Sequence, residues 1–286
     1  MKRLVAPILS LVVLVAAAVA VLTYITDEHL DTHLIVEEVE GSAKVTSEEE
    51  GEWNMKRGKK VRANDIVRTG ADGRAVLSFS DDTEIRLGSS THIAVQKIGQ
   101  EGVTLELEDG ALEATVRKGA GALHVGAGER KVVTLDADFR IGRRGENVVV
   151  DVDRGELKVV GAVDVSELSA GSRARVDSTG QGTVVPVPDD LLLLVEWPER
   201  RTRQDSVALE GTTEPGARVR IDGGLRTVEV VADADGGFSA LVPLQEGTTT
   251  LHVGSKDILG TEADAEGTVE RDTQGPTFQA GVEYSP

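Results

Sequence analysis

The first 26 residues and the rest of the chain differ in their hydropathy pattern. Residues 4–26 contain no charged side chain and consist mostly of leucine, valine and alanine. As a helix with a rise of about 1.5 Å per residue, this stretch would be about 34 Å long, slightly more than the hydrocarbon core of a bilayer. The pattern therefore predicts a transmembrane helix over residues 4–26.

From residue 34 to residue 177, apolar and polar positions alternate with a period of two, which is typical of strands with one buried face. Residues 103–108 alternate in this way, Asp109-Gly110 then predicts a two-residue hairpin turn, and residues 112–116 return on the buried side. No stretch after the apolar segment keeps a period of 3.6 residues. The part of the chain after the apolar segment is therefore predicted to be all-β.

Two more strand patterns follow in the same region. Residues 133–141 alternate without interruption and predict a single strand with one buried face. Residues 148–152 lead through Asp153-Arg154-Gly155 into residues 157–159, which predicts a second hairpin.

The charges that flank the apolar segment predict its orientation. Lys2 and Arg3 precede it and Asp27 and Glu28 follow it, so the positive-inside rule places the N-terminus in the cytoplasm and exports the rest of the chain. An alternative is a signal peptide cleaved after the small residues 18–20, followed by secretion. The apolar run continues to residue 25, which is longer than an ordinary signal core and favours an uncleaved anchor. We expect a single-pass protein of the bacterial cytoplasmic membrane, with its bulk periplasmic or extracellular.

Composition excludes several functions. The chain of 286 residues has a formal net charge of −18, so it would repel a phosphate backbone, and we expect no nucleic-acid partner. It has no cysteine, which excludes disulfides, thiolate metal sites and a cysteine nucleophile. Aromatic residues make up 3% of the chain, too few for an extensive stacking surface for sugars or bases.

The order of motifs after the apolar segment resembles the FecR domain, the periplasmic sensory part of membrane-anchored sigma-factor regulators. The motifs that carry the resemblance are residues 39–45, 64–70, 73–79, 82–88, 139–141, 153–159 and 169–172. The resemblance implies a FecR-like β domain over residues 34–177. Two positions depart from the family pattern: Asn64 replaces the usual glycine, and residues 136–138 replace an arginine-glycine-threonine run.

The resemblance also bears on the partner. FecR-type regulators hold their sigma factor with a cytoplasmic segment of dozens of residues before the membrane helix, whereas only residues 1–3 precede the apolar segment here. Three residues cannot bury the several hundred Å² per partner that a specific complex needs. Direct sigma-factor binding is therefore not expected.

A second domain is predicted after a polar, proline-containing linker at residues 178–190. Residues 191–195 read as a first strand buried in a sandwich core, and strand-like runs follow at residues 207–209, 218–221, 227–231, 238–242 and 249–253. The sequence motifs at residues 209–219, 233–239, 242–247 and 271–276 resemble those of bacterial Ig-like domains. We expect an Ig-like β-sandwich over residues 191–276, followed by a tail at residues 277–286.

Metal candidates are few. His29 and His33 lie at helical i, i+4 spacing and could hold zinc or copper. Two histidines without a third ligand are a weak signal, so a solvated stub leaving the membrane is the favoured interpretation. Asp233 and Asp235 suggest calcium, but the spacing of an EF-hand loop fails at residues 238 and 244, and a hairpin turn is the favoured interpretation.

One cluster of basic residues, Lys56, Arg57, Lys59 and Lys60 with Arg62 close by, could touch anionic lipid headgroups or envelope phosphates. The favoured interpretation is a solvated hairpin tip that balances the acidic residues 48–50. Glycine-rich phosphate loops and the serine motifs of hydrolases are missing from the sequence, so we expect no cofactor and name no catalytic residue.

Three functions remain open. The leading hypothesis is a membrane-anchored, non-enzymatic envelope module whose two β domains bind or sense an envelope protein or glycan. The second is FecR-type transmembrane signalling that acts through a separate partner. The third is a carbohydrate-active enzyme or an accessory domain of carbohydrate metabolism, which we rank last because no acid–base pair can be named.

Overall fold

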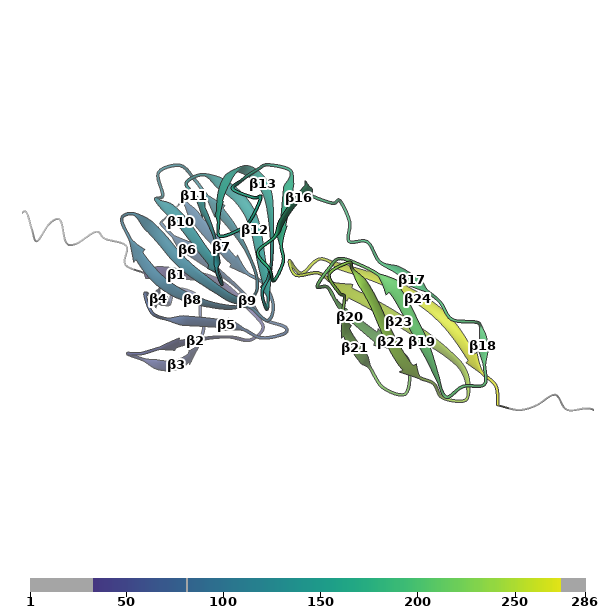
Figure 1. The fold of residues 1–286 in the computed structure, drawn as a ribbon. Helices are drawn as coiled ribbons and strands as arrows, with labels where there is room; N and C mark the ends of the chain where they lie inside the picture. Colours follow the sequence, from purple (N-terminus) through teal and green to yellow (C-terminus); the bar gives the residue numbers. More distant parts are fainter. Residues whose placement is uncertain (1–32, 81, 274–286) are drawn as a thin grey trace, which may run out of the picture.

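The computed structural model describes residues 33–80 and 82–273, and every regular element in these ranges is a β-strand (Figure 1). The predicted all-β class is confirmed for this part of the chain. The predicted anchor at residues 4–26 and the candidate His29 lie outside the described residues. Within the described ranges, no helix is long and apolar enough to cross a bilayer.

The N-terminal unit is a 16-stranded arrangement that divides into two groups of paired strands, linked by two strands that take part in both. The first group runs in the order β4 (Lys60–Arg62), β1 (His33–Glu40), β6 (Arg74–Phe79), β7 (Thr83–Leu87), β9 (Gly102–Val116), β12 (Ala137–Arg144), β13 (Asn147–Val160), β15 (Ser172–Val176) and β16 (Gly182–Pro186). The second runs in the order β3 (Gly51–Asn54), β2 (Ala43–Ser47), β5 (Ile66–Thr69), β8 (His92–Gly99), β9, β10 (Ala122–Ala127), β11 (Arg130–Thr134), β13 and β14 (Glu167–Ser169).

The long strands β9 and β13 bend at a glycine and pass from one group to the other. The first half of β9 pairs with β8 and β10, and its second half pairs with β7 and β12. At the bends, Gly110 and Gly155 have φ angles of 92° and 80°, values that favour glycine. The hairpins predicted at Asp109-Gly110 and at residues 153–155 are therefore wrong, because the chain continues forward through each glycine.

The strand predicted over residues 133–141 is also wrong. Strand β11 ends at Thr134 and β12 starts at Ala137, with a turn between them. Leu135 lies in that turn and is 63% exposed, although its position in the alternation predicts burial. Thr134 is buried instead, and its hydroxyl donates a hydrogen bond to the carbonyl oxygen of Glu156 at 3.0 Å. The buried positions are even-numbered in β11 and odd-numbered in β12, so the regular alternation of the sequence does not correspond to one continuous strand.

The core of the N-terminal unit is formed by apolar side chains of both groups, and Phe139 is the largest fully buried side chain. The turns carry residues that the sequence singled out. Asn64 has a φ of 70°, so the asparagine adopts the left-handed conformation that a glycine adopts easily. Asp65 is buried, and its Oδ2 accepts a hydrogen bond from the backbone N–H of Arg62 at 2.8 Å, the usual role of an aspartate in a turn.

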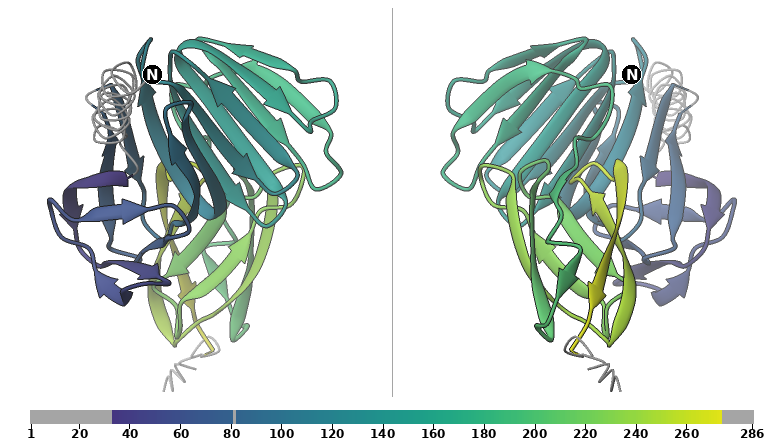
Figure 2. Two further views of the ribbon diagram at one scale, coloured as in Figure 1. Left: turned by 90° about the vertical axis from the view of Figure 1, so that its left-hand side faces the viewer. Right: turned by 90° about the vertical axis from the view of Figure 1, so that its right-hand side faces the viewer.

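The C-terminal unit consists of two small sheets that share a hydrophobic core. One contains β17 (Leu194–Glu196), β19 (Ser206–Thr212) and β22 (Gly237–Pro243); the other contains β18 (Arg201–Thr202), β24 (Glu262–Arg271), β23 (Gly247–Lys256), β20 (Arg218–Asp222) and β21 (Val228–Val231). Five of these strands coincide with the predicted runs at residues 207–253. Figure 2 shows the two units in side views, the N-terminal unit in purple to teal and the C-terminal unit in green to yellow.

Three details differ from the prediction near the boundary and at the C-terminal end. Strand β16 pairs with β15, so the sheet of the N-terminal unit extends into the expected linker at residues 178–190. The first strand of the C-terminal unit is β17 rather than residues 191–195, and Leu192 and Leu194 are each 57% exposed. Strand β24 carries no strong sequence signal because Val269 is its only buried residue.

Candidate functional site at the junction of the two units

A buried ion pair lies on the face of the N-terminal unit that meets the C-terminal unit. Asp151 of β13 and Arg173 of β15 are directly opposite each other in the antiparallel pairing. Arg173 donates from Nε and Nη2 to the two carboxylate oxygens of Asp151 at 2.6 and 2.7 Å. Arg140, which is opposite Asp151 on β12, adds a bond from Nη2 at 3.0 Å. Asp151 is fully buried, so three neighbouring strands enclose one carboxylate between two guanidinium groups.

The same cluster reaches the C-terminal unit. Arg173 Nη1 lies 3.8 Å from Glu214 Oε1 and 4.0 Å from Asp257 Oδ2, and Arg175 also forms an ion pair with Glu214. Burial opposes the charged form of Arg173, but the hydrogen bonds and the charge of Asp151, assisted by Glu214 and Asp257, outweigh it and raise the pKa of Arg173. The charges of the two units are therefore complementary at their junction.

A loop of the C-terminal unit packs closely on strand β12. Arg144 donates from Nη1 to the carbonyl oxygen of Gly216 at 2.6 Å and from Nη2 to that of Asp257 at 3.3 Å. A Cβ at Gly142 would lie 2.7 Å from the carbonyl oxygen of Ile258, so the absence of a side chain at Gly142 permits this approach. The turn between β23 and β24 carries Ile258 and points toward the N-terminal unit (Figure 1).

A cavity of about 540 Å³ lies at this junction. Its lining combines residues of the N-terminal unit, including Arg74 and Arg144, with Arg218 and the loop at residues 256–261 of the C-terminal unit. Burial, and next the positive charge of Arg218, lower the pKa of Arg144. The junction therefore holds the two units together through polar contacts. It also contains a cavity that is lined by several cationic side chains.

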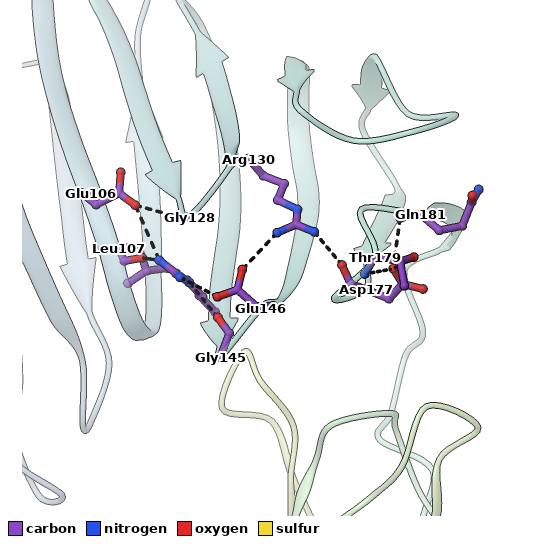
Figure 3. A network of polar contacts seen from close by, with 10 residues as sticks. Glu106, Leu107, Gly128, Arg130, Gly145, Glu146, Asp177, Thr179 and Gln181 are labelled. Atoms are coloured by element: carbon purple, nitrogen blue, oxygen red, sulfur yellow. Dashed lines mark hydrogen bonds and ion pairs between the residues drawn. The ribbon is translucent and has the colours of Figure 1, made fainter.

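A second polar network fixes the turn that follows Arg144, at residues 145 and 146 (Figure 3). Arg130 is 5% exposed; its Nη1 lies 3.3 Å from Glu146, and its Nη2 donates to the carbonyl oxygen of Asp177 at 2.8 Å. Arg143 contacts Glu146 at 3.4 Å and Glu106 at 3.6 Å. These contacts hold the turn between β12 and β13 against the neighbouring turns, and so they position the adjacent junction residues.

The basic residues predicted from the sequence take no part in the contacts of this junction. Lys56, Arg57, Lys59 and Lys60 are all exposed, and Lys59 Nζ lies 5.9 Å from the centroid of the Trp53 ring. Arg62 forms ion pairs with Glu50 at 2.9 Å and Glu49 at 3.8 Å. Lys56 and Arg57 line an open groove of about 1000 Å³, and Glu37, Glu38 and Glu40 line it as well. A role in binding anionic headgroups stays a prediction.

The predicted metal candidates do not come together in the described part of the chain. Asp233 Oδ1 accepts hydrogen bonds from the backbone N–H groups of Asp235 at 3.0 Å and Gly237 at 2.8 Å, the pattern of a hairpin turn. His33 is the first residue of β1. No group of three or more His, Asp or Glu side chains that could hold a metal ion occurs in residues 33–80 and 82–273.

His92 is a pH-sensitive position that the sequence did not reveal. Arg68 Nε donates to His92 Nε2 at 3.0 Å, and His92 Nδ1 lies 3.0 Å from Glu108 Oε2, so the neutral ring with a proton on Nδ1 satisfies both contacts. Burial lowers the pKa of His92, the charge of Glu108 opposes this, and the charge of Arg68 adds to it.

We therefore expect the protein to lose stability when His92 becomes protonated. Because the pKa in the folded state is lowered, the unfolded chain binds the proton more readily, and stability falls as the pH drops below about 6.5, the ordinary histidine pKa. His92→Gln keeps a polar side chain without the titration, so its stability should fall less between pH 7.5 and 5.5. Urea unfolding at both pH values measures this, and equal losses in the two proteins would contradict it.

Comparisons with known proteins identify part of the N-terminal unit. Residues 65–158, about a third of the chain, match the family described as FecR protein. The resemblance to the FecR domain is confirmed over these residues, whereas the Ig-like resemblance of residues 191–276 stays a prediction. No curated protein sequence matches the chain.

Two crystal structures of a candidate anti-sigma factor from Parabacteroides distasonis, at 1.65 and 2.50 Å resolution, align with the chain. The sequence identities are 18% and 17%, and the TM-score is 0.38 in both cases. Each alignment covers 42% of this chain and 59% of the other, so the chain spans little more than half the length of these proteins.

Proposed function

We propose that the chain is a non-enzymatic sensing module of the bacterial cell envelope, anchored by residues 4–26 and exposed outside the cytoplasm. The observation that carries the proposal is the FecR match over residues 65–158, because FecR-type domains belong to signalling regulators rather than to enzymes. The polar alternation and short turns of the second unit support an Ig-like sandwich with a binding role.

The junction supports transmission of a signal between the units. Arg173 faces carboxylates of both units, and Arg144 holds two carbonyl groups of the C-terminal unit. A ligand or partner that displaced one unit would have to break these contacts, so binding to one unit changes the environment of the other. The proposed output is signalling through a separate protein partner.

Exposure outside the cytoplasm can be tested with single cysteines, because the natural chain has none. Glu101, whose side chain is 86% exposed, and Leu225, which is 64% exposed, offer one position in each unit. Glu101→Cys and Leu225→Cys should react in intact spheroplasts with a maleimide that cannot cross the inner membrane, while the natural chain gives the background. Labelling that requires lysis of the spheroplasts would refute the proposed location.

Signalling can be tested separately. Deletion of the gene should change the transcripts of a defined group of envelope genes, and expression of the natural chain should restore them. Transcripts that stay unchanged would contradict a signalling role. Hydrolysis of a polysaccharide by the purified chain would contradict the non-enzymatic assignment.

A further inference from the structure

We propose that the junction cavity is a binding site for a phosphate-bearing small molecule, held between Arg144 of the N-terminal unit and Arg218 of the C-terminal unit. The cavity of about 540 Å³ falls within the usual range of small-molecule sites and is larger than a single phosphate needs. This inference stands on the cavity itself and does not depend on membrane anchoring or signalling.

The charge of the cavity runs against that of the whole protein. The chain carries a net charge of −18, yet cationic side chains outnumber carboxylates in the lining. The cationic residues are Arg74, Arg140, Arg144, Arg218 and Lys256, and the acidic residues are Asp109, Glu113 and Asp257. A hollow with a cationic lining concentrates anions even when the protein as a whole is acidic.

Arg218 is the most informative of these residues. In the described ranges no hydrogen bond or ion pair is formed by its side chain, whereas Arg220, two residues further along β20, binds Asp222 at 2.7 Å. Arg218 is directly opposite Lys256 in the pairing of β20 with β23, and like charges in that position repel each other. Lys256 has Glu262 at 2.9 Å, so Arg218 is the member of this pair that has no carboxylate partner among the described residues.

Arg144 approaches the same cavity from the other unit. Its guanidinium holds two backbone carbonyl oxygens, and within the described residues no carboxylate oxygen lies within 4.0 Å of it. Burial and the charge of Arg218 disfavour its charged form and outweigh the opposing charges of Asp109 and Asp257. An oxyanion between Arg144 and Arg218 would replace this repulsion with attraction to both groups.

Guanidinium groups favour a phosphate over a halide or a neutral ligand. Their N–H groups form a planar fork that donates two hydrogen bonds to two oxygens of one phosphate. Two forks from different units can hold different oxygens of the same group, and the remaining volume can accommodate a sugar-sized body. The proposed ligand would therefore bridge the two units and stabilise their junction.

The test is isothermal titration calorimetry on the purified full-length chain in detergent micelles, with glucose 6-phosphate, inorganic phosphate and glucose as probes. We expect the two phosphates to bind with a Kd of about 1 mM or tighter at low ionic strength, and glucose to give no heat. Stronger binding of glucose 6-phosphate would point to an organic phosphate as the ligand, and equal binding to the free ion. No heat from either phosphate would overturn the proposal.

Matched variants locate the site. Arg218→Gln should weaken binding about tenfold or more, because it removes one charged fork. Its thermal unfolding temperature should not fall below that of the natural chain, since Arg218 is exposed, has no side-chain partner among the described residues and is repelled by Lys256. Arg220→Gln, on the same strand but outside the cavity, should leave the affinity nearly unchanged. Equal binding by Arg218→Gln and the natural chain would overturn the proposal.

Discussion

Asp151→Asn should lower the free energy of unfolding by about 3–5 kcal/mol, the usual cost of removing one partner of a buried ion pair. The amide has nearly the size of the carboxylate, so the loss arises from charge rather than from a cavity. Arg173 would remain almost completely buried without its main anionic partner, since Glu214 and Asp257 are 3.8 and 4.0 Å away. Urea unfolding at pH 7, followed by circular dichroism, measures the change.

Asp153 provides the control for this substitution. It lies on the same strand, two residues further on, and is exposed. Asp153→Asn removes the same charge from solvent-exposed surface, so its effect should stay within about 0.5 kcal/mol. Similar losses in the two variants would show that overall charge, rather than the buried pair, determines stability.

A double variant separates the net contribution of the pair from the cost of breaking it. Asp151→Leu with Arg173→Met replaces both charges by apolar groups, which in other proteins is often neutral or stabilising. We expect this double variant to lose less stability than Asp151→Asn alone, although Arg140 would still lose its contact with Asp151. Asp151→Leu and Arg173→Met are also measured singly. If the double variant loses as much stability as the sum of these two single variants, the two side chains are not coupled.

The contacts at the junction of the two units could not be predicted from the sequence. In residues 148–152, Val149 and Asp151 alternate with the buried Val148, Val150 and Val152, so a strand with one buried face would expose them, yet both are buried. The contacts that bury this face come from residues far away in the chain: Arg175 and Glu214 are 39 residues apart, and Arg144 and Asp257 are 113 apart. An alternating sequence predicts that one face of a strand is apolar, but it does not predict that another unit covers the opposite face of that strand.

Strands and turns could be predicted from the sequence where neighbouring residues determine the local conformation. The all-β class followed from the period of two, and the runs at residues 207–209 and 238–242 both lie within strands. Asp65 accepts a backbone hydrogen bond within a turn, as its residue type predicts. Asn64 departs from the family glycine but tolerates a positive φ, so the turn is preserved.

The bent strands show why a correct local signal led to a wrong topology. In β9 the buried positions change from odd numbers, such as Leu105, to even numbers, such as Leu112, on either side of Gly110. A hairpin and a bend both require a glycine with positive φ and both shift the parity of burial. Only the pairing partners of each half distinguish the two, and those partners are distant in sequence.

Gly155→Ala should therefore destabilise the protein because it places a side chain inside the bend of β13. A non-glycine residue at a φ of 80° costs about 1–2 kcal/mol. A Cβ at this position would also lie 2.2 Å from the carbonyl oxygen of Asp136 and 3.0 Å from the Cα of Ala137, both backbone atoms. Displacing them adds about 1–3 kcal/mol, for a total loss of about 2–5 kcal/mol in urea unfolding.

Gly171 is a close control, because it also has a φ of 80°, but a Cβ there would meet no atom within 4 Å beyond its chain neighbours. In Gly171→Ala the free energy of unfolding should fall only by the cost of the left-handed conformation. The stabilisation that comes from a stiffer unfolded chain is the same in both variants. The difference between the two, about 1–3 kcal/mol, measures the crowding where β13 passes from one group of strands to the other. Equal losses would mean that the bend leaves room for a side chain and that positive φ alone requires glycine there.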